Sequence, residues 1–255
     1  MIDLHSHILP GIDDGAKDEE EAVKLLQIAC ESGISKIAFT SHFNCEEMDL
    51  ERFLKRRQMS CRRLKKALQA QEDLKGKLWF KLGAEVKYSP NLVHLDLQKL
   101  CISGTGYLLL ELPFEEHPYH FDETVYWMQL QGIQPVIAHI ERYSYMMKHM
   151  ETVLEWVENG LYIQANASSL LRKDALSRQL LQMIRANLIQ VLASDTHSVL
   201  KRPPLLTEGM QLVRKKLGGQ TAERLEKNAA CIFAGRFLEK EEAYCPQKRL
   251  GRWRT

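Results

Sequence analysis

Histidine and carboxylate side chains stand at the ends of short apolar segments along this chain. His5 and His7 close the first such segment, and Asp195 and His197 close the last, and the members of each pair lie two positions apart. Residues two apart on a strand point to the same face, so His5 and His7 could share one ion, and Asp195 and His197 again share a face. The spacing therefore predicts a site for divalent metal ions. A short H-x-H motif also arises by chance, so this prediction depends on what ends the other segments.

Further candidate ligands end other apolar segments. His42 ends the second segment, Glu85 the third, Glu111 the fourth and His139 the fifth. The two glutamates interrupt the apolar runs LGAEV and LLLEL, and a buried charge without a partner is costly, which favours metal ligands over ordinary ion-paired carboxylates. His139 taken alone is better explained as a hydrogen-bonded core histidine.

The sequence Asp13-Asp14-Gly15 follows in the first loop. Aspartate and glycine favour turns, so a turn could explain these residues. Because the same loop carries the first histidine pair, we favour Asp14 as a further ligand. Imidazoles and carboxylates without thiolates suit manganese, iron, zinc or magnesium, and the imidazoles favour the first three metals.

Two arginines could hold a phosphoryl group beside such ions. Arg142 follows His139 in HIER, and Arg202 follows His197 in KRPP. Arginine makes bidentate contacts to phosphoryl oxygens, although ordinary surface charge would explain either residue equally well. Metal ions that activate a water molecule for attack on phosphorus would make the chain a phosphoric monoester hydrolase.

The six cysteines argue against a phosphatase with a cysteine nucleophile, because none has an arginine six positions further on. They are scattered and form no C-x-x-C motif, which predicts free thiols and a cytoplasmic location. The opening MIDLHSH lacks the features of a secretory signal. No apolar run approaches the roughly 18 residues that span a membrane, so we expect no membrane insertion.

Charge gives little support for nucleic-acid binding. The chain has 35 basic and 33 acidic residues, a formal net charge of +2. A net charge this close to zero argues against a nucleic-acid partner bound through bulk charge. Residues 52–66 are strongly basic and could contact an acidic partner, but a solvated helix face explains them better.

Apolar strands alternate with amphipathic helices along the chain. Strands are predicted at residues 1–7, 36–42, within 78–88, and at 107–112, 134–140, 161–165 and 189–194. Helices are predicted at residues 18–32, 46–75, 120–131, 150–159 and 175–186, and near 207–217 and 221–229. This alternation predicts an α/β fold with a parallel sheet, in which functional residues gather at the carboxyl ends of the strands. Seven units suit a closed or nearly closed barrel better than a doubly wound sheet, although periodicity does not separate the two.

Taken together, these motifs resemble the PHP (polymerase and histidinol phosphatase) superfamily. Within it, the chain looks like the bacterial manganese-dependent protein-tyrosine phosphatases of capsule and exopolysaccharide biosynthesis. The matching segments, in order, are MIDLHSHILPGIDDGAKDEEEA, TSHF, GAEVKY, LLLELP, PVIAHIERY, ASDTHS and RPP. The subfamily often has methionine where Thr196 stands, which puts no ligand in doubt. The resemblance implies a PHP domain over residues 1–238, folded as a distorted (β/α)7 TIM-like barrel; the tail, residues 239–255, lies outside it and could be disordered.

The resemblance also implies where the metal ions bind. Two or three divalent ions are expected, with Mn²⁺ as the metal and Fe, Zn or Mg as alternatives. One ion would take His5, His7, Glu85 and Asp195, a second Glu85, Glu111 and His139, and a third Asp14, His42 and His197. Arg142 and Arg202 would grip the phosphate.

The substrate follows from the resemblance rather than from the ligands. It implies hydrolysis of phosphotyrosine on a protein, such as the tyrosine-rich tail of a membrane-bound bacterial tyrosine kinase that regulates capsule synthesis. The metal ligands alone would serve any phosphomonoester. Histidinol-phosphate phosphatase, a PHP-type nuclease and a non-enzymatic, metal-stabilised binding module therefore remain as alternatives.

Overall fold

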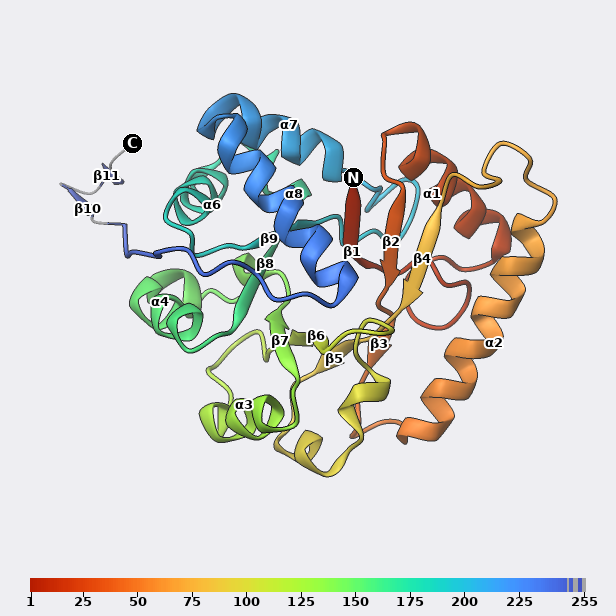
Figure 1. The fold of residues 1–255 in the computed structure, drawn as a ribbon, viewed down its shortest axis with the longest axis horizontal. Coiled ribbons are helices and arrows are strands. Elements are labelled where there is room, and N and C mark those ends of the chain that lie inside the picture. Colours follow the sequence, from red (N-terminus) through yellow and green to blue (C-terminus); the bar gives the residue numbers. More distant parts are fainter. Residues whose placement is uncertain (247, 250–251, 254–255) are drawn as a thin grey trace.

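Parallel strands surrounded by helices form the body of the protein, as the sequence pattern predicts (Figure 1). The computed structural model describes residues 1–246, 248–249 and 252–253. Within them, nine strands form two parallel sheets, ordered β1-β2-β4 and β3-β5-β6-β7-β8-β9. These strands are β1 (Ile2–Ser6), β2 (Lys36–Phe39), β3 (His42–Phe43), β4 (Trp79–Leu82), β5 (Glu85–Lys87), β6 (Tyr107–Glu111), β7 (Gln134–Ile137), β8 (Tyr162–Asn166) and β9 (Val191–Ala193). A short antiparallel pair, β10 (Lys248–Arg249) and β11 (Arg252–Trp253), lies in the tail.

The second and third predicted strands are each divided in two. Residues 36–42 contain β2 and the start of β3, and residues 78–88 contain β4 and β5. At the break the pairing shifts, because the Glu85 backbone N–H lies 3.0 Å from the Thr40 carbonyl and 3.2 Å from the Ser41 carbonyl. Such an irregular step interrupts a ladder and bends the strand. The prediction that His42 and Glu85 end their strands is therefore wrong, since they are the first residues of β3 and β5.

Backbone hydrogen bonds also connect β1 with the segment that follows β9. The Asp195 N–H donates to the His5 carbonyl at 3.0 Å, and the His7 N–H donates to the Thr196 carbonyl at 2.7 Å. Ser6 and Thr196 form a parallel bridge. The first and last strands of the chain thus bring their histidine–carboxylate pairs together.

Eight α-helices of the described residues cover the sheets. They are α1 (Glu19–Glu31), α2 (Leu50–Leu68), α3 (Phe121–Leu130), α4 (Met150–Glu158), α5 (Ala167–Leu170), α6 (Ala175–Arg185), α7 (Leu206–Leu217) and α8 (Gly219–Ala234). Short 3₁₀ turns occur at η1 (Pro90–His94), η2 (Leu97–Lys99), η3 (Ile140–Arg142) and η4 (Met146–Lys148). Asp18 caps α1 as predicted, because its carboxylate accepts the Glu21 N–H at 2.9 Å.

Two helices differ from their predicted bounds. The predicted helix over residues 46–75 is too long, since α2 begins after Asp49, whose carboxylate accepts the Arg52 N–H at 2.9 Å. Its end at Leu68 is followed by turns through Lys77. In contrast, α8 is longer than predicted and ends at Ala234, followed by the cap residue Gly235 with a φ of 70°.

The sheets bury a core on both of their faces. The larger cluster lies between the strands and the surrounding helices, with Leu25, Phe39 and Leu64 almost fully buried. A second cluster takes strand residues such as Leu4 and Leu109 and joins them to α8. The helices therefore hold the strand ends, and the polar residues on them, in fixed positions.

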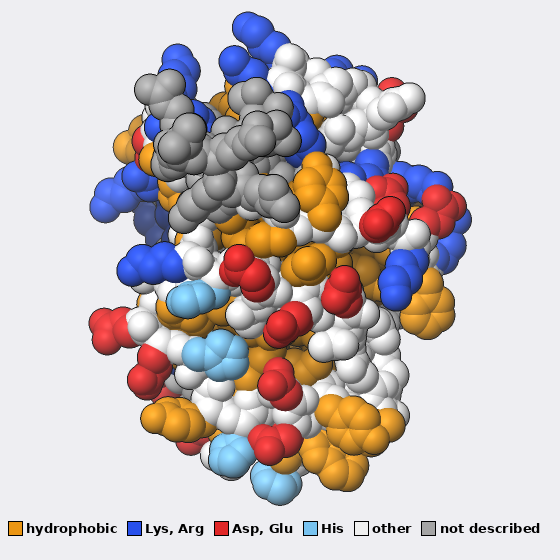
Figure 2. Space-filling view, turned by 90° about the vertical axis from the view of Figure 1, so that its left-hand side faces the viewer, with side chains coloured by type: hydrophobic (Ala, Val, Ile, Leu, Met, Phe, Trp, Pro, Cys, Tyr) orange, Lys and Arg blue, Asp and Glu red, His pale blue; other side chains and the backbone are white. Residues whose placement is uncertain are grey.

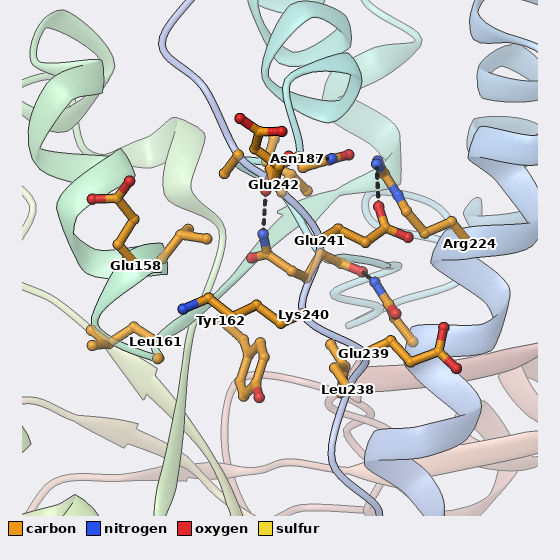
Figure 3. Close-up of a pocket in the computed structure, with 16 residues that line it drawn as sticks. Glu158, Leu161, Tyr162, Asn187, Arg224, Leu238, Glu239, Lys240, Glu241 and Glu242 are labelled. Carbon is orange, nitrogen blue, oxygen red and sulfur yellow. Dashed lines mark hydrogen bonds and ion pairs between the residues drawn. The ribbon is translucent and has the colours of Figure 1, made fainter.

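The first part of the tail packs against the body of the protein. The Asn187 side-chain amide donates to the Glu242 carbonyl at 2.7 Å, and Arg224 pairs with Glu241 at 3.1 Å. Together with α4, β8 and α8, residues 238–243 line an open cavity of about 640 Å³ (Figure 3). This cavity adjoins the start of β8, at the amino ends of the strands. Disorder is predicted for residues 239–255, of which residues 247, 250–251 and 254–255 lie outside the described ones.

Acidic side chains gather on one side of the molecule. Figure 2 shows acidic side chains running down the middle of the side that carries α3 and α4, above exposed apolar groups. The α2 helix lies at the opposite edge in Figure 1. No helix among the described residues is long and apolar enough to cross a membrane.

Candidate metal centre

The predicted ligand residues gather where β1, β6, β7 and β9 end and where β3 and β5 begin. His5 lies in β1 and Glu111 ends β6, whereas His139 and Asp195 follow β7 and β9. Asp195 and His139 have positive φ angles of 54° and 30°, which turn the chain sharply where each strand ends. The candidate side chains gather into three groups whose ligand atoms lie within 4.8 Å of one another.

The first group contains His5, His7, Glu85 and Asp195, all of them buried. The Nε2 atoms of His5 and His7 lie 3.1 Å apart, and each is 3.1 Å from Glu85 Oε2. Asp195 Oδ1 lies 3.3 Å from His5 Nε2. These four residues are the set that the resemblance assigns to the first ion, and their donor atoms converge on one point.

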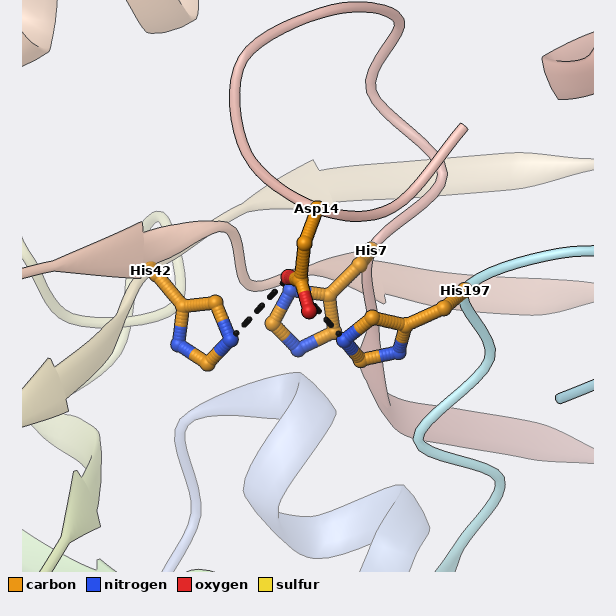
Figure 4. Close-up of side chains that lie close together, drawn as sticks. All are labelled: His7, Asp14, His42 and His197. Carbon is orange, nitrogen blue, oxygen red and sulfur yellow. Dashed lines mark ion pairs between the residues drawn. The ribbon is translucent and has the colours of Figure 1, made fainter. Parts of the chain in front are cut away.

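The second group contains Asp14, His42 and His197, the set assigned to the third ion, and adds His7 (Figure 4). Asp14 Oδ1 lies 3.4 Å from His42 Nε2 and 3.3 Å from His197 Nε2. Asp14 is 66% exposed, so this group opens to solvent on the side of the first loop.

The third group differs in part from the expected set. It contains His42, Glu85 and Glu111, whereas the resemblance assigns Glu85, Glu111 and His139 to one ion. His139 nevertheless lies beside both glutamates, with its Nε2 atom 2.6 Å from Glu85 Oε1 and 3.6 Å from Glu111 Oε1. Glu85 also lies 3.2 Å from His42 Nδ1. Glu85 thus adjoins all three groups, as a bridging ligand would.

Unsatisfied polar atoms fit a site for cations. Within the described part of the chain, the buried Asp195 Oδ1 and His197 Nε2 atoms make no hydrogen bond. Leaving buried polar atoms without a hydrogen bond is costly, and a bound cation would satisfy both. The donors are imidazole nitrogens and carboxylate oxygens, which suit manganese, iron or zinc.

The electrostatics agree with this assignment. Burial alone would raise the pKa of Glu85, but the charge of His5 and the hydrogen bond with His139 outweigh it and hold that pKa well below its ordinary value. Burial lowers the pKa of His139, which favours the neutral ring that a metal requires. In contrast, burial and the adjacent charge of Glu85 raise the pKa of Glu111. The carboxylates beside His5 and His7 outweigh burial and raise the pKa of both rings, so a divalent cation would displace their protons.

Several residues that orient the ligands are absent from the sequence-based prediction. Asp13 Oδ2 lies 2.8 Å from His7 Nδ1 and also accepts the His42 backbone N–H at 3.0 Å. Gln164 Oε1 lies 3.1 Å from His5 Nδ1, and Asn166 donates to Asp195 Oδ2 at 2.7 Å.

A signal for Gln164 and Asn166 is present in the sequence. In YIQAN the two amides alternate with apolar residues, and both are buried on the face of β8 that looks toward the cluster. Polar residues two apart inside an apolar strand could have marked the sixth strand as part of the site.

The two predicted arginines occupy different environments. Arg202 pairs with Asp195 Oδ2 at 2.5 Å and is 38% exposed. Arg142 is exposed, and its guanidinium carbon lies 4.5 Å from the centre of the Phe114 ring. Both lie next to ligand residues of the cluster, at its rim.

Comparisons with known proteins agree with this geometry. The chain is 32% identical to the tyrosine-protein phosphatase YwqE of Bacillus subtilis over 248 residues, covering 94% of each chain. It is 29% identical to the putative tyrosine-protein phosphatase CapC of Staphylococcus aureus, again covering 94% of each chain. A crystal structure from work on YwqE and on CpsB of Streptococcus pneumoniae, "unique metal-dependent tyrosine phosphatases", superposes with a TM-score of 0.88. That match has 29% identity and covers 98% of this chain and 100% of the other.

A family model gives the same result and confirms the resemblance seen in the motifs. The model of the family "Capsular polysaccharide synthesis, CpsB/CapC" matches residues 1–234. That match spans every candidate ligand and both arginines. The chain therefore belongs to the CpsB/CapC family of capsular polysaccharide synthesis.

Proposed function

We propose that this chain is a metal-dependent protein-tyrosine phosphatase. The observation that carries the proposal is the buried convergence of His5, His7, Glu85 and Asp195, with two arginines at the rim. The relatives named as tyrosine phosphatases match over nearly the whole chain. The two sheets are proposed to form the distorted seven-stranded barrel of the PHP fold, which the bridge between Ser6 and Thr196 supports.

The nine candidate ligands would hold two or three divalent ions, with Mn²⁺ as the proposed metal. The proposed ligands are His5, His7, Asp14, His42, Glu85, Glu111, His139, Asp195 and His197. Bound ions would supply Lewis-acid stabilisation of the phosphoryl group and a water molecule activated for attack.

The chain's own residues orient the substrate. Arg142 and Arg202 would bind the equatorial phosphoryl oxygens, with Arg202 held in place by Asp195. The leaving tyrosine phenolate has a pKa near 10, low for an alcohol, so it departs readily. None of the six cysteines belongs to the metal-ligand groups, so no thiol nucleophile is required.

The proposed substrate is phosphotyrosine in a flexible acidic segment, such as the tyrosine-rich tail of a membrane-bound bacterial tyrosine kinase, encountered in the cytosol. The exposed face of α2 supports this, because Arg52, Lys55, Arg62 and Lys66 line one side of it around the exposed Met59. The acidic side chains down the middle of the side seen in Figure 2 would repel such a segment. The basic face of α2 could attract the segment by long-range charge.

Turnover of four substrates under one metal and salt condition tests the proposal. A phosphotyrosine peptide should give a much higher kcat/KM than histidinol phosphate, a phosphoserine peptide or single-stranded DNA. A preference for histidinol phosphate or DNA would assign the chain to another PHP activity. Bound metal with no turnover of any substrate would favour a binding module. Added salt should weaken the peptide preference if α2 contributes.

A further inference from the structure

Phe114 is an exposed aromatic residue next to the metal cluster. It follows β6 and Glu111, and its side chain is 42% exposed. Its ring centre lies 6.2 Å from that of His139 and 5.9 Å from that of Tyr143, against which it stacks. The ring therefore forms part of the rim of the site.

Two hydrogen bonds fix the backbone of Leu112 and Pro113, the two residues before Phe114. The Tyr143 hydroxyl accepts the Leu112 N–H at 2.9 Å, and the Tyr145 hydroxyl donates to the Pro113 carbonyl at 2.8 Å. Both tyrosines belong to the segment that carries Arg142. The loop with the aromatic ring and the loop with the arginine are thus joined, so the ring and the guanidinium keep a defined relationship.

The two arginines at the rim are held by different kinds of group. The Asp195 carboxylate holds Arg202 by one Nη2 donor and offsets its charge. The Arg142 guanidinium makes no hydrogen bond or ion pair within the described residues, and its carbon atom lies 4.5 Å from the centre of the Phe114 ring. An aromatic face attracts a cation without occupying its in-plane N–H groups. All five donors of Arg142 stay available to a ligand.

We propose that Phe114 is a positioning residue, which holds the Arg142 guanidinium at the rim with its donors free for the phosphoryl group. This inference rests on the proposed function only in assigning Arg142 to the phosphate. Without the ring, the long, exposed Arg142 side chain would sample many rotamers. Ordering it when phosphate binds would cost conformational entropy and so weaken phosphate affinity.

The test measures the Kd of inorganic phosphate for the Mn²⁺-loaded protein, together with its metal content. Phe114→Leu should raise the Kd by about two- to five-fold, the change expected for an exposed cation–π contact, and leave metal content unchanged. Phe114→Tyr keeps the ring and should bind phosphate like the parent. Tyr126→Leu, which removes an aromatic residue of similar exposure from α3, is the matched control and should have no effect.

A double-mutant cycle decides whether Phe114 acts through Arg142. In an Arg142→Ala background, Phe114→Leu should cause no further loss of phosphate affinity. An equal loss in both backgrounds, an unchanged Kd in the single variant, or a loss of metal from it would each overturn the proposal. The phosphate Kd does not depend on the organic part of the substrate. If the parent binds phosphate in this way but does not hydrolyse phosphotyrosine, the proposed function fails while this inference stands.

Discussion

Asp13 and His7 form a buried pair, in which the Asp13 carboxylate lies 2.8 Å from His7 Nδ1. A carboxylate at this nitrogen makes Nδ1 the donor and leaves Nε2 directed at Glu85 and the cluster. Burial would raise the pKa of Asp13, but the charge and hydrogen bond of His7 outweigh it and lower that pKa to about 2. Asp13 is therefore ionised across the physiological range and fixes the ring of His7.

Replacing Asp13 by asparagine should weaken metal binding while preserving the fold. Loss of a carboxylate that orients a metal-binding histidine costs roughly 10- to 100-fold in metal affinity. Isothermal titration with Mn²⁺ measures the change. Asp18→Asn is the matched control, since it makes the same chemical change at the α1 cap, where asparagine also caps well. Equal Mn²⁺ affinity in both variants would contradict the role assigned to Asp13.

A chain of amides links three of the candidate ligands, so Gln164→Leu should impair metal binding as well as stability. Gln164 Oε1 accepts the His139 backbone N–H at 2.8 Å, and its Nε2 donates to Asn166 at 2.9 Å. The buried partners left unpaired should lower the free energy of unfolding by about 1–3 kcal/mol. Chemical denaturation and metal titration measure the two effects.

Gln190→Leu provides the comparison for this prediction. Gln190 also accepts a backbone N–H, that of Ile163 at 2.9 Å, but lies at the start of β9, away from the cluster. The Gln190→Leu variant should lose stability and keep its affinity for Mn²⁺. If both variants lost metal equally, the effect of Gln164→Leu on metal binding would come from general destabilisation.

The motifs mark the candidate ligands without knowledge of the fold, because residue types and apolar runs are local properties of the sequence. Asp14 and His42, 28 positions apart, meet as predicted because both follow neighbouring strands. The hydrophobic periodicity of the sequence does not reveal the strand break before Glu85, because that break depends on how the backbones of two strands pair. The stacking of Arg142 on Phe114 is likewise a contact between loops 28 positions apart, with no motif to mark it.

Gly15→Ala should disturb the first loop and its ligands. A Cβ atom at this position would lie 1.9 Å from the His7 carbonyl oxygen, so the backbone must move. Because Asp13 and Asp14 stand on the same loop, we expect a loss of Mn²⁺ affinity by more than about ten-fold. Gly76→Ala is the control, since its φ of 71° is strained for alanine but no atom lies within 4 Å of the added Cβ. The prediction is wrong if Gly15→Ala binds Mn²⁺ like the parent.

Thiol chemistry should not contribute to turnover. Burial raises the pKa of Cys101 to about 12, so its thiol stays protonated at neutral pH. Burial also raises the pKa values of Cys45 and Cys61. Treatment with iodoacetamide at pH 7 should leave kcat/KM within about two-fold of the untreated enzyme. Inactivation that follows alkylation of one cysteine, with metal content and stability unchanged, would refute this.

Removing the metal should abolish activity and also destabilise the fold. Without cations, the donor atoms of His5, His7, Glu85 and Asp195 crowd together inside the protein, and Asp195 Oδ1 makes no hydrogen bond within the described residues. A ligand at 100 times its Kd stabilises the native state by about 2.7 kcal/mol, and several ions would add to this. Chelation should therefore lower Tm, and Mn²⁺ should restore both Tm and turnover. Asp195→Ala is the matched control: it should lose metal and most activity, and its Tm should respond less to chelation. Full phosphatase activity in a protein shown by elemental analysis to be metal-free would contradict the assignment of this cluster as the catalytic centre.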